Sequence, residues 1–375
     1  MAVTIDNPFI ITGYESPTYF CDRKSETAQL IDALHNGRNV TLTSPRRMGK
    51  TGLILHAFHL LKEQHPDRRT IYIDLFATES IADFTRVFST AVLGRLDSNP
   101  VRMMKKAAAI VKGARPTIYL DEVTGSPKIS LDFVKGEEEH TIEQVFNYLK
   151  ESGKECYIAF DEFQQVATYP EKNVEALLRS HIQHIHNAHF IFSGSQAHML
   201  NEMFLSPKRP FYQSSSHMAI GPIEENAYFI FASAFFSKKK TELDKDSFHH
   251  VYQRYNGHTW YIQKILNELY ARKEDRLDEE LIQQTIRHII EENEYYYQML
   301  VRAYSKGQVK LIKAIAKEKV VKEITSGSFI TKYGLTATSS VKSALKRLLD
   351  EEVVYLSEEG YSIYDRFFGE WLAEK

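Results

Sequence analysis

Two stretches of this sequence carry side chains whose types and spacing could bind and cleave a polyphosphate. The first is Ser44-Pro45-Arg46-Arg47-Met48-Gly49-Lys50-Thr51, which matches the phosphate-loop pattern G-x-x-x-x-G-K-[ST] with serine in place of the first glycine. Backbone N–H groups of such a loop, together with the positive end of the following helix, bind a polyanion. We expect Lys50 to reach the β- and γ-phosphates and the Thr51 hydroxyl to be a Mg²⁺ ligand. The alternative is a basic turn that matches by coincidence.

The second stretch is Asp161-Glu162, two adjacent carboxylates directly after the apolar run Cys156-Tyr157-Ile158-Ala159-Phe160. This arrangement is typical of the Walker B motif. We expect Asp161 to hold Mg²⁺ through its water shell and Glu162 to orient and polarise the attacking water. An acidic pair after a strand can also be only a helix cap, but the phosphate loop upstream favours the catalytic interpretation.

Other polar groups are further candidates. Ser193, Ser195 and Gln196 end a later apolar run, where a hydroxyl or amide could sense the γ-phosphate, and of these we favour Ser195. The alternative is a turn that needs Gly194 for its backbone. An arginine could neutralise charge in the transition state, in cis or from a neighbouring subunit. The candidates are Arg46, Arg47 and Arg209.

This chemistry requires elements that bring the stretches together. Strand-like runs at 39–43, 69–75, 155–160 and 189–196 alternate with helical patterns such as 51–61. The alternation predicts an α/β fold, a parallel sheet with helices on both faces. Ligands of such sheets bind at the carboxyl ends of the strands, where the phosphate loop and the acidic pair both fall.

We expect three domains. Residues 1–222 form a P-loop domain, interrupted near 100–139 by a hairpin-like insertion whose basic run at 102–106 is a solvated face. Residues 223–304 lack strand-like runs and carry aromatics at helical spacing, which predicts an all-helical lid. Residues 305–375 show the pattern of three helices and a strand pair, typical of a winged helix-turn-helix.

The third helix of that last domain presents Lys342, Lys346 and Arg347, but the acidic run 350–352 follows directly. The charges from residue 305 onward nearly balance, so no strong electrostatic footprint for nucleic acid appears. DNA binding and a protein-contact or autoinhibitory role therefore both stay open.

Composition bounds the class of protein. The 375 residues are 43% hydrophobic and 26% charged, with a formal net charge of −2, as in an ordinary soluble globular protein. Cys21 and Cys156 fit no metal or redox spacing, and the histidines between 181 and 189 have no further ligand at a spacing consistent with zinc. No apolar run reaches membrane-spanning length. We expect a cytoplasmic protein with no membrane partner.

Together these motifs resemble the archaeal-type ATPase family of the STAND branch of AAA+ P-loop NTPases, over nearly the whole chain. The discriminating features are the Pro-Arg-Arg insert in the phosphate loop, similar to G-P-R-R-x-G-K-T, and Asp161-Glu162-Phe163-Gln164, similar to D-E-F-Q. Further similarities are Asn7-Pro8-Phe9, Phe20-Cys21-Asp22-Arg23-Lys24-Ser25-Glu26 (F-x-G-R-x-x-E), Ser193-Gly194-Ser195 and Gly257-His258-Thr259-Trp260-Tyr261. The sequence departs from the family at Asp22 and Ser44, which replace glycines, and at Thr259, which replaces proline.

The resemblance implies ATP and Mg²⁺ as cofactors, bound between the α/β domain and the lid. It adds Arg23, near the adenine, and His258, in the lid, to the nucleotide-binding residues, which otherwise run from Ser44 to Gly52. It also implies an ATP-driven switch, slow or partner-regulated, that reports to an unidentified protein partner and could oligomerise on binding ATP. Two other hypotheses stay open: a DNA-binding regulator or mobile-element protein with a mainly structural nucleotide site, and a kinase-like phosphotransferase.

Overall fold

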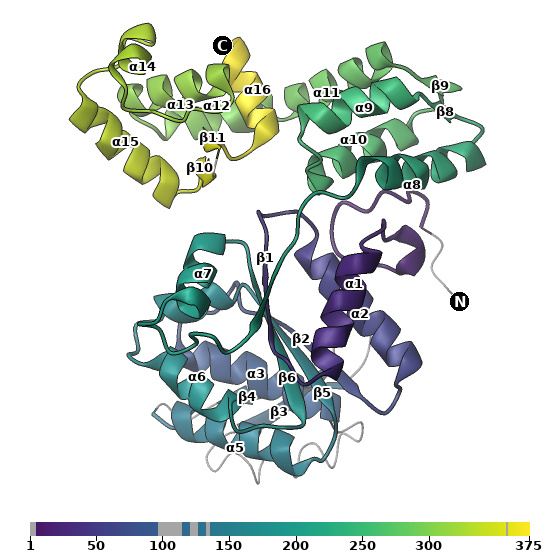
Figure 1. Cartoon of the computed structure of the whole chain (residues 1–375), viewed down its shortest axis with the longest axis vertical. Coiled ribbons are helices and arrows are strands. Elements are labelled where there is room, and N and C mark those ends of the chain that lie inside the picture. The colour runs from purple at the N-terminus through teal and green to yellow at the C-terminus, as the bar shows by residue number, and fades with distance from the viewer. Residues whose placement is uncertain (1–4, 97–114, 121–126, 133–135, 358) are drawn as a thin grey trace. The chain divides into compact units, whose positions relative to one another are not determined.

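The computed structural model describes residues 5–96, 115–120, 127–132, 136–357 and 359–375. Its central element is a five-stranded parallel sheet in the order β2-β5-β6-β1-β7 (Figure 1). The strands are β1 (Val40–Thr43), β2 (Arg69–Asp74), β5 (Cys156–Asp161), β6 (Ala188–Gly194) and β7 (Ser216–Ala219). Because all carboxyl ends of a parallel sheet lie at one edge, the phosphate loop after β1 and the acidic pair after β5 share that edge.

Helices cover both faces of this sheet (Figure 1). One face carries α1 (Lys24–His35) and α2 (Lys50–Gln64), and the other carries α3 (Ile81–Leu96), α5 (Glu138–Glu151), α6 (Val174–Ile182) and α7 (Ala197–Leu205). Successive side chains of β5 point to opposite faces of the sheet, so the strand contributes to the hydrophobic core on each face. Tyr157 and Ala159 belong to the first core, whereas Ile158 and Phe160 belong to the second. The expected α/β fold is confirmed.

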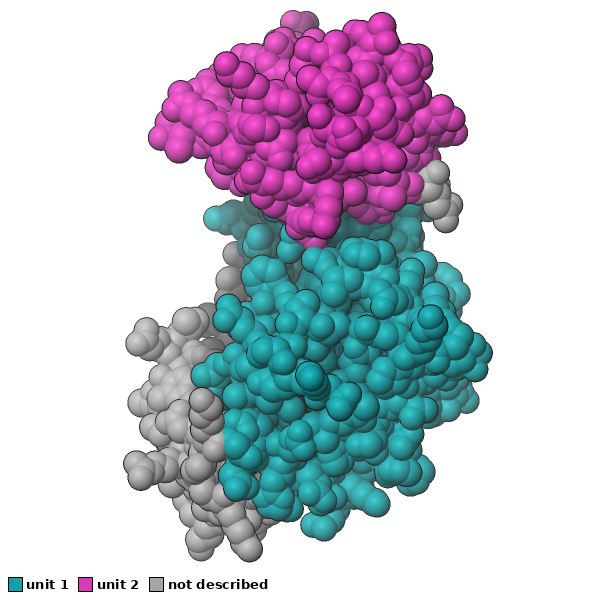
Figure 2. All heavy atoms as spheres, turned by 90° about the vertical axis from the view of Figure 1, so that its left-hand side faces the viewer, with its two compact units in different colours: residues 1–235, 256–267 teal, residues 236–255, 268–375 magenta. Residues whose placement is uncertain are grey.

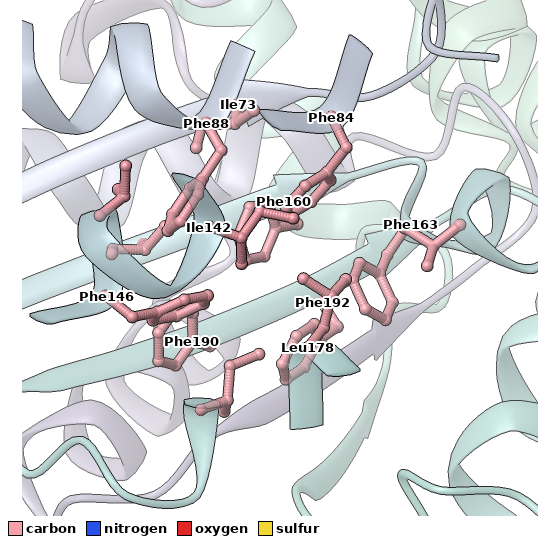
Figure 3. Close-up of a cluster of buried hydrophobic side chains, with 14 of the residues drawn as sticks. Ile73, Phe84, Phe88, Ile142, Phe146, Phe160, Phe163, Leu178, Phe190 and Phe192 are labelled. Carbon is pink, nitrogen blue, oxygen red and sulfur yellow. The ribbon is translucent and has the colours of Figure 1, made fainter. Parts of the chain in front are cut away.

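Phenylalanines dominate the core on the second face (Figure 3). Phe160 of β5 is fully buried. Its ring centroid lies between 5.6 and 6.3 Å from those of Phe84, Phe88, Phe163, Phe190 and Phe192. Rings at such separations attract each other beyond the burial of their area. Because Phe160 directly precedes Asp161 and Phe163 directly follows Glu162, this packing fixes the backbone of the acidic pair.

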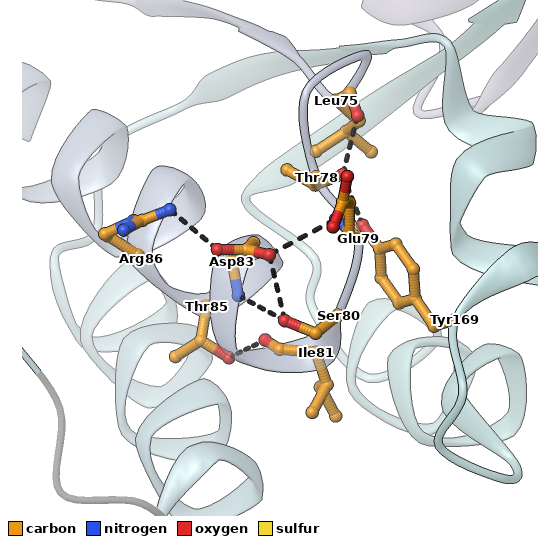
Figure 4. A network of polar contacts seen from close by, with 9 residues as sticks. All are labelled: Leu75, Thr78, Glu79, Ser80, Ile81, Asp83, Thr85, Arg86 and Tyr169. Carbon is orange, nitrogen blue, oxygen red and sulfur yellow. Dashed lines mark hydrogen bonds and ion pairs between the residues drawn. The ribbon is translucent and has the colours of Figure 1, made fainter.

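A polar network fixes the turn between β2 and α3 (Figure 4). Ser80 Oγ donates to Asp83 Oδ2 at 2.9 Å and accepts from the Asp83 backbone N–H at 3.2 Å, which caps the helix. Thr78 Oγ1 donates to the Leu75 carbonyl oxygen at 2.6 Å and lies 2.6 Å from the Tyr169 hydroxyl oxygen. The turn at the carboxyl end of β2 is therefore fixed by Thr78 and Ser80 from the turn itself and by Tyr169 from a distant part of the chain.

The structure differs from the sequence-based expectation in two places. The sequence does not predict β7, since Ser216–Ala219 carries no apolar run, and the segment is a strand because it pairs with β1. The region expected to be an all-helical lid contains two parallel two-residue strands, β8 (Glu242–Leu243) and β9 (Arg276–Leu277). The region is otherwise helical as expected, and the sequence does not predict these two strands because two residues are too few to produce a strand-like pattern.

The chain forms two compact units (Figure 2). Unit 1 spans 1–235 and 256–267, and unit 2 spans 236–255 and 268–375. The domain boundaries expected at 222 and 304 stay a prediction. Within unit 1, the antiparallel strands β3 (Arg115–Leu120) and β4 (Pro127–Asp132) lie where the sequence suggests a hairpin-like insertion. The basic run 102–106 lies outside the described residues.

The helices α8 (Glu225–Lys238) and α10 (Thr259–Ala271) each contribute residues to both units. Unit 2 also contains α9 (Lys245–Arg254), α11 (Glu279–Glu292) and α12 (Glu294–Arg302). It ends in the expected winged helix, formed by α13 (Lys306–Glu318), α14 (Gly327–Lys332), α15 (Thr338–Asp350), the antiparallel strands β10 (Val354–Ser357) and β11 (Gly360–Ile363), and α16 (Arg366–Glu374). None of the described helices has both the length and the apolar character needed to span a membrane.

Replacing Phe160 with alanine tests whether this core supports the acidic pair. We expect Phe160→Ala to lower the free energy of unfolding by about 3–5 kcal/mol, because it leaves a cavity among five other rings. Phe76→Ala is the matched control, since Phe76 is 58% exposed and its loss should cost less than about 0.5 kcal/mol. Urea unfolding of the two variants would measure this. Equal losses would contradict the assignment of Phe160 to the core.

Candidate functional site

A cavity of about 510 Å³ lies within unit 1, where the phosphate loop meets the acidic pair. Its lining comes from loop residues 46–52, the ends of β5 and β6, a segment between residues 10 and 23, Ile223 after β7, and the beginning of α10. The cavity therefore unites the two motifs that are far apart in the sequence.

The phosphate loop connects β1 to α2, which begins at Lys50. Gly49 has a φ of +97° and Arg47 a φ of +60°, so the chain passes twice through the left-handed region before the helix starts. Ser44 does not adopt a positive φ. A serine is therefore tolerated where the phosphate-loop pattern has its first glycine.

The ammonium group of Lys50 is buried, and its hydrogen-bond partners are neutral. Nζ donates to the Ser44 carbonyl oxygen at 3.1 Å, to Ser44 Oγ at 3.1 Å and to the Pro45 carbonyl oxygen at 3.3 Å. Burial lowers the pKa of Lys50, and the charges of Glu162 and Asp161 oppose this shift. A buried cation bound only by neutral oxygens favours an anionic ligand, so the site fits the phosphates of a nucleotide.

Asp161 is buried and accepts hydrogen bonds from several elements. Its Oδ2 accepts from Thr51 Oγ1 at 2.6 Å and from the Tyr72 hydroxyl at 2.7 Å. Its Oδ1 accepts from Ser193 Oγ and from the backbone N–H of Glu162. Burial, with the charge of Asp161, raises the pKa of Tyr72, so the phenol keeps its proton and acts as a donor. The hydroxyl and carboxylate oxygens of Thr51 and Asp161 are ligands that Mg²⁺ prefers, and the pair fits that ion.

Glu162 lies at the mouth of the same site, directly before a 3₁₀ helix, η2 (Phe163–Thr168). Its Oε2 accepts from the Ser195 backbone N–H at 3.1 Å, from Ser195 Oγ at 2.9 Å and from Gln164 Nε2 at 2.5 Å. Asp74, at the end of β2, is a neighbouring carboxylate whose pKa is raised by burial. Ser195, favoured above as a phosphate sensor, therefore contacts the carboxylate expected to activate water.

The Met48 carbonyl oxygen connects the phosphate loop to two other parts of the cavity lining. Arg23, only 2% exposed, donates to it from Nη2 at 3.1 Å, and Thr259 Oγ1 donates to it at 3.4 Å. The Arg47 guanidinium lies 4.3 Å from the centroid of the Trp260 ring, a cation–π contact. The phosphate loop is thus bonded to the beginning of α1 and to the first turn of α10.

Most of the predicted site residues lie at this cavity. Those that line it are Arg23, Arg46, Arg47, Met48, Gly49, Lys50, Thr51, Gly52, Asp161, Glu162 and Ser195. Ser44 and Pro45 do not line it, but their oxygens bind Lys50.

Three predicted residues lie elsewhere. Gln196 directly precedes α7 and does not line the cavity. His258 does not line the cavity, and its ring contacts that of Tyr261 with centroids 4.8 Å apart. Arg209 pairs with Glu175 and Glu202 and does not line it either.

Two residues of the site carry no sequence signal. Tyr72 sits in an ordinary strand, and only the pairing of β2 with β5 brings its hydroxyl to Asp161. Gln263 lines the cavity and accepts a hydrogen bond from the Tyr228 hydroxyl at 2.8 Å.

Asp22 has a φ of +51°, so it replaces the glycine of the family pattern in a conformation that aspartate tolerates.

Comparison with protein families gives two matches. Residues 20–265 match an ATPase domain predominantly from Archaea, and residues 295–374 match a probable winged helix domain. A search of curated proteins finds no match.

Several solved structures are similar over nearly the whole chain. The Walker-type ATPase PABY2304 of Pyrococcus abyssi has a TM-score of 0.67 and 17% identity, covering 97% of this chain and 99% of that one. The ORC1 protein of Aeropyrum pernix, solved in complex with DNA, has a TM-score of 0.53 and 14% identity, covering 100% and 98%. The ORC2 protein of the same organism, solved as ADPNP–ADP complexes, has a TM-score of 0.54 and 15% identity, covering 94% and 92%. At these identities the similarity shows the fold.

Replacing Lys50 with methionine tests the anion site. We expect Lys50→Met to weaken nucleotide binding by about 100-fold, because the variant cannot form hydrogen bonds from a charged group to the phosphates. The nucleotide-free protein should be as stable as wild type or more stable, because the variant removes a buried cation. Burying the Lys50 cation destabilises the wild-type protein fully at pH values below the pKa of Lys50 in the folded state. This destabilisation disappears as the pH rises to 10.5, the ordinary pKa of a lysine. The difference in stability between Lys50→Met and wild type should therefore narrow at alkaline pH.

Titration with a fluorescent nucleotide and urea unfolding at several pH values would measure both effects. Lys62→Met is the matched control, since Lys62 is an exposed residue of the same helix. Wild-type nucleotide affinity in Lys50→Met would contradict the assignment of the site.

Proposed function

This chain belongs to the family of ATPase domains predominantly from Archaea, and we propose that it is a Mg²⁺-dependent ATPase acting as a nucleotide-controlled switch. One observation carries the proposal. A single cavity holds a buried Lys50 that has no anionic hydrogen-bond partner among the described residues, the hydrogen-bonded pair Thr51 and Asp161, and Glu162 beside them. We place the chain in the STAND branch, which the Pro-Arg-Arg insert and the Asp161-Glu162-Phe163-Gln164 motif support.

Each group has a role in phosphoryl transfer to water. Lys50 and the backbone N–H groups of loop 46–52 bind the β- and γ-phosphates. Thr51 and Asp161 would hold Mg²⁺, which would supply charge stabilisation at the transferred phosphoryl group. Oε2 of Glu162 is engaged by protein donors, and Oε1 has none among the residues that the structure describes. Oε1 is therefore the oxygen that orients water.

The switch is supported by the contacts of the phosphate loop with the first turn of α10. Thr259 donates to the Met48 carbonyl oxygen, and Arg47 stacks on Trp260. Both Met48 and Arg47 belong to the loop that wraps the phosphates, so nucleotide binding biases the first turn of α10. That helix continues into unit 2, where the winged helix reports the nucleotide state to a protein partner.

The Glu162→Gln variant tests hydrolysis. We expect it to bind Mg-ATP within about threefold of wild type and to lose turnover at least about 100-fold, because the amide cannot accept a proton. Glu143→Gln, a change at an exposed carboxylate of α5, is the matched control. Steady-state phosphate release and equilibrium nucleotide binding are the measurements. Turnover at the wild-type rate in Glu162→Gln would contradict the proposed role.

The same assay, scanned over protein concentration, tests for an oligomeric site. Arg46 and Arg47 line the cavity and can act in cis. Arg209 pairs with Glu175 in its own chain and could act only from a neighbouring subunit. Turnover per molecule that rises with concentration would support an oligomer, and constant turnover would favour action in cis.

DNA binding by the winged helix is a second candidate function. Lys342 and Lys346 are exposed on α15. The adjacent groove, of about 710 Å³, is lined by Lys306, Lys310 and Arg347, and none of the described residues that line it carries a carboxylate. Arg347 is itself paired with Glu351 at 2.7 Å, which reduces the positive charge available to a phosphate backbone.

Charge reversal at Lys342 and Lys346 tests this candidate. A plot of log affinity against log salt concentration has a negative slope. In the double variant Lys342→Glu, Lys346→Glu, we expect this slope to become shallower by about 0.9 for each DNA phosphate that a lysine no longer neutralises. Lys273→Glu, at another exposed position of unit 2, is the control. Anisotropy of a labelled duplex at several salt concentrations would measure the slope. Absent or salt-independent binding by wild type would dismiss the candidate.

A further inference from the structure

The side chain of Gln164 is buried directly beside the proposed water-orienting carboxylate. Gln164 lies in η2, two residues after Glu162, and only 3% of it is exposed. Its Nε2 donates to Glu162 Oε2 at 2.5 Å. Its Oε1 is buried and has no hydrogen-bond partner. The bond to Glu162 is therefore the only side-chain hydrogen bond that this amide makes among the described residues.

The orientation of the amide follows from charge. The opposite orientation would place Oε1 of Gln164 against the carboxylate of Glu162, where two acceptors repel each other. The observed orientation leaves Oε1 without a partner but gives the carboxylate an N–H donor. A buried polar group with an unmet acceptor is costly, so it calls for a reason beyond filling space.

Gly194, the last residue of β6, makes room for this amide. A Cβ added to Gly194 would lie 2.0 Å from Gln164 Oε1 and 3.1 Å from its Cδ. Gly194 does not adopt a positive φ, so space rather than backbone conformation requires glycine here. The amide of Gln164 thus occupies the place that a side chain at residue 194 would take.

Gly194 leaves the space, and Ser195 and Gln164 then donate hydrogen bonds to the same oxygen, Oε2 of Glu162. Ser195 donates to Glu162 Oε2 through its backbone N–H and its Oγ, and Gln164 adds a third donor. All three engage Oε2, and none engages Oε1. Three donors, two from Ser195 and one from Gln164, fix the direction of the carboxylate.

We propose that Gln164 is a positioning residue that orients the Glu162 carboxylate for water activation, in a space that Gly194 leaves open. This inference rests on the proposed ATPase function and adds a residue to it. It also explains why a glutamine occupies the fourth position of Asp161-Glu162-Phe163-Gln164: serine and asparagine are shorter and methionine lacks the donor.

Two substitutions at residue 164 separate positioning from packing. Gln164→Glu keeps the size but places a second carboxyl group next to Glu162, so the two groups share a proton at neutral pH. The acidic limb of its turnover–pH profile should move upward by at least about one pH unit, with turnover recovering at alkaline pH. Gln164→Met keeps the volume without the donor and should lower turnover about tenfold or more across the pH range, with nucleotide affinity within about twofold of wild type.

Gln165→Glu and Gln165→Met are the matched controls, since Gln165 is the neighbouring residue and does not line the cavity. They should leave both turnover and its pH profile unchanged. A Gln164→Glu profile that coincides with that of wild type, or full turnover in Gln164→Met, would overturn the proposal.

A double-mutant cycle in the nucleotide-free protein tests the hydrogen bond without requiring turnover. Gln164→Met should lower the folding equilibrium constant by some factor in the wild-type background. In a Glu162→Ala background, the factor by which Gln164→Met lowers this constant should be about five times smaller. Additive effects would overturn the proposal. If the coupling is present while wild type and Glu162→Gln release phosphate equally slowly, the hydrogen bond stands and the ATPase proposal fails.

Discussion

The hydrogen bonds that converge on the Asp161 carboxylate are the interaction on which the rest of the site depends. They come from Thr51 at the start of α2, from Tyr72 in β2 and from Ser193 in β6. A carboxylate buried at this depth is tolerated only when its oxygens are satisfied, and here each oxygen accepts two bonds. The parallel register of β2, β5 and β6 brings these donors to one edge of the sheet. Asp161 therefore connects the phosphate loop to the carboxyl ends of the strands.

The distribution of charge around Asp161 follows from this arrangement. Lys50 is buried nearby but bonded to neutral oxygens, whereas Asp161 is bonded to neutral donors. The two charges are thus kept apart by the loop, which leaves the cation available to phosphate and the carboxylate available to Mg²⁺. Glu162 is fixed separately, by Ser195 and Gln164. In the proposed function, phosphate binding, metal coordination and water activation therefore fall to different side chains of one cavity.

The sequence predicts those parts of the site whose residues are contiguous in the chain. The phosphate loop and the acidic pair are such parts, because each follows a strand and its residues are contiguous. Strand order is not local, so the donor role of Tyr72 and the existence of β7 become visible only through pairing with β5 and β1. The space beside Gly194 belongs to the same class, since residue 164 fills it from another element. His258 shows the converse: it belongs to a matching motif, yet it contacts Tyr261 and does not line the cavity.

The most direct test of the central claim is an experimental structure of the Glu162→Gln chain with saturating Mg-ATP. We expect the triphosphate within loop 46–52, with Lys50 Nζ bonded to it and released from the oxygens of Ser44 and Pro45. We also expect Mg²⁺ on Thr51 Oγ1, with Asp161 reaching the ion through its water shell. An empty cavity with Lys50 still bonded to its own loop, or nucleotide bound elsewhere on the chain, would show that this cavity is not the nucleotide site.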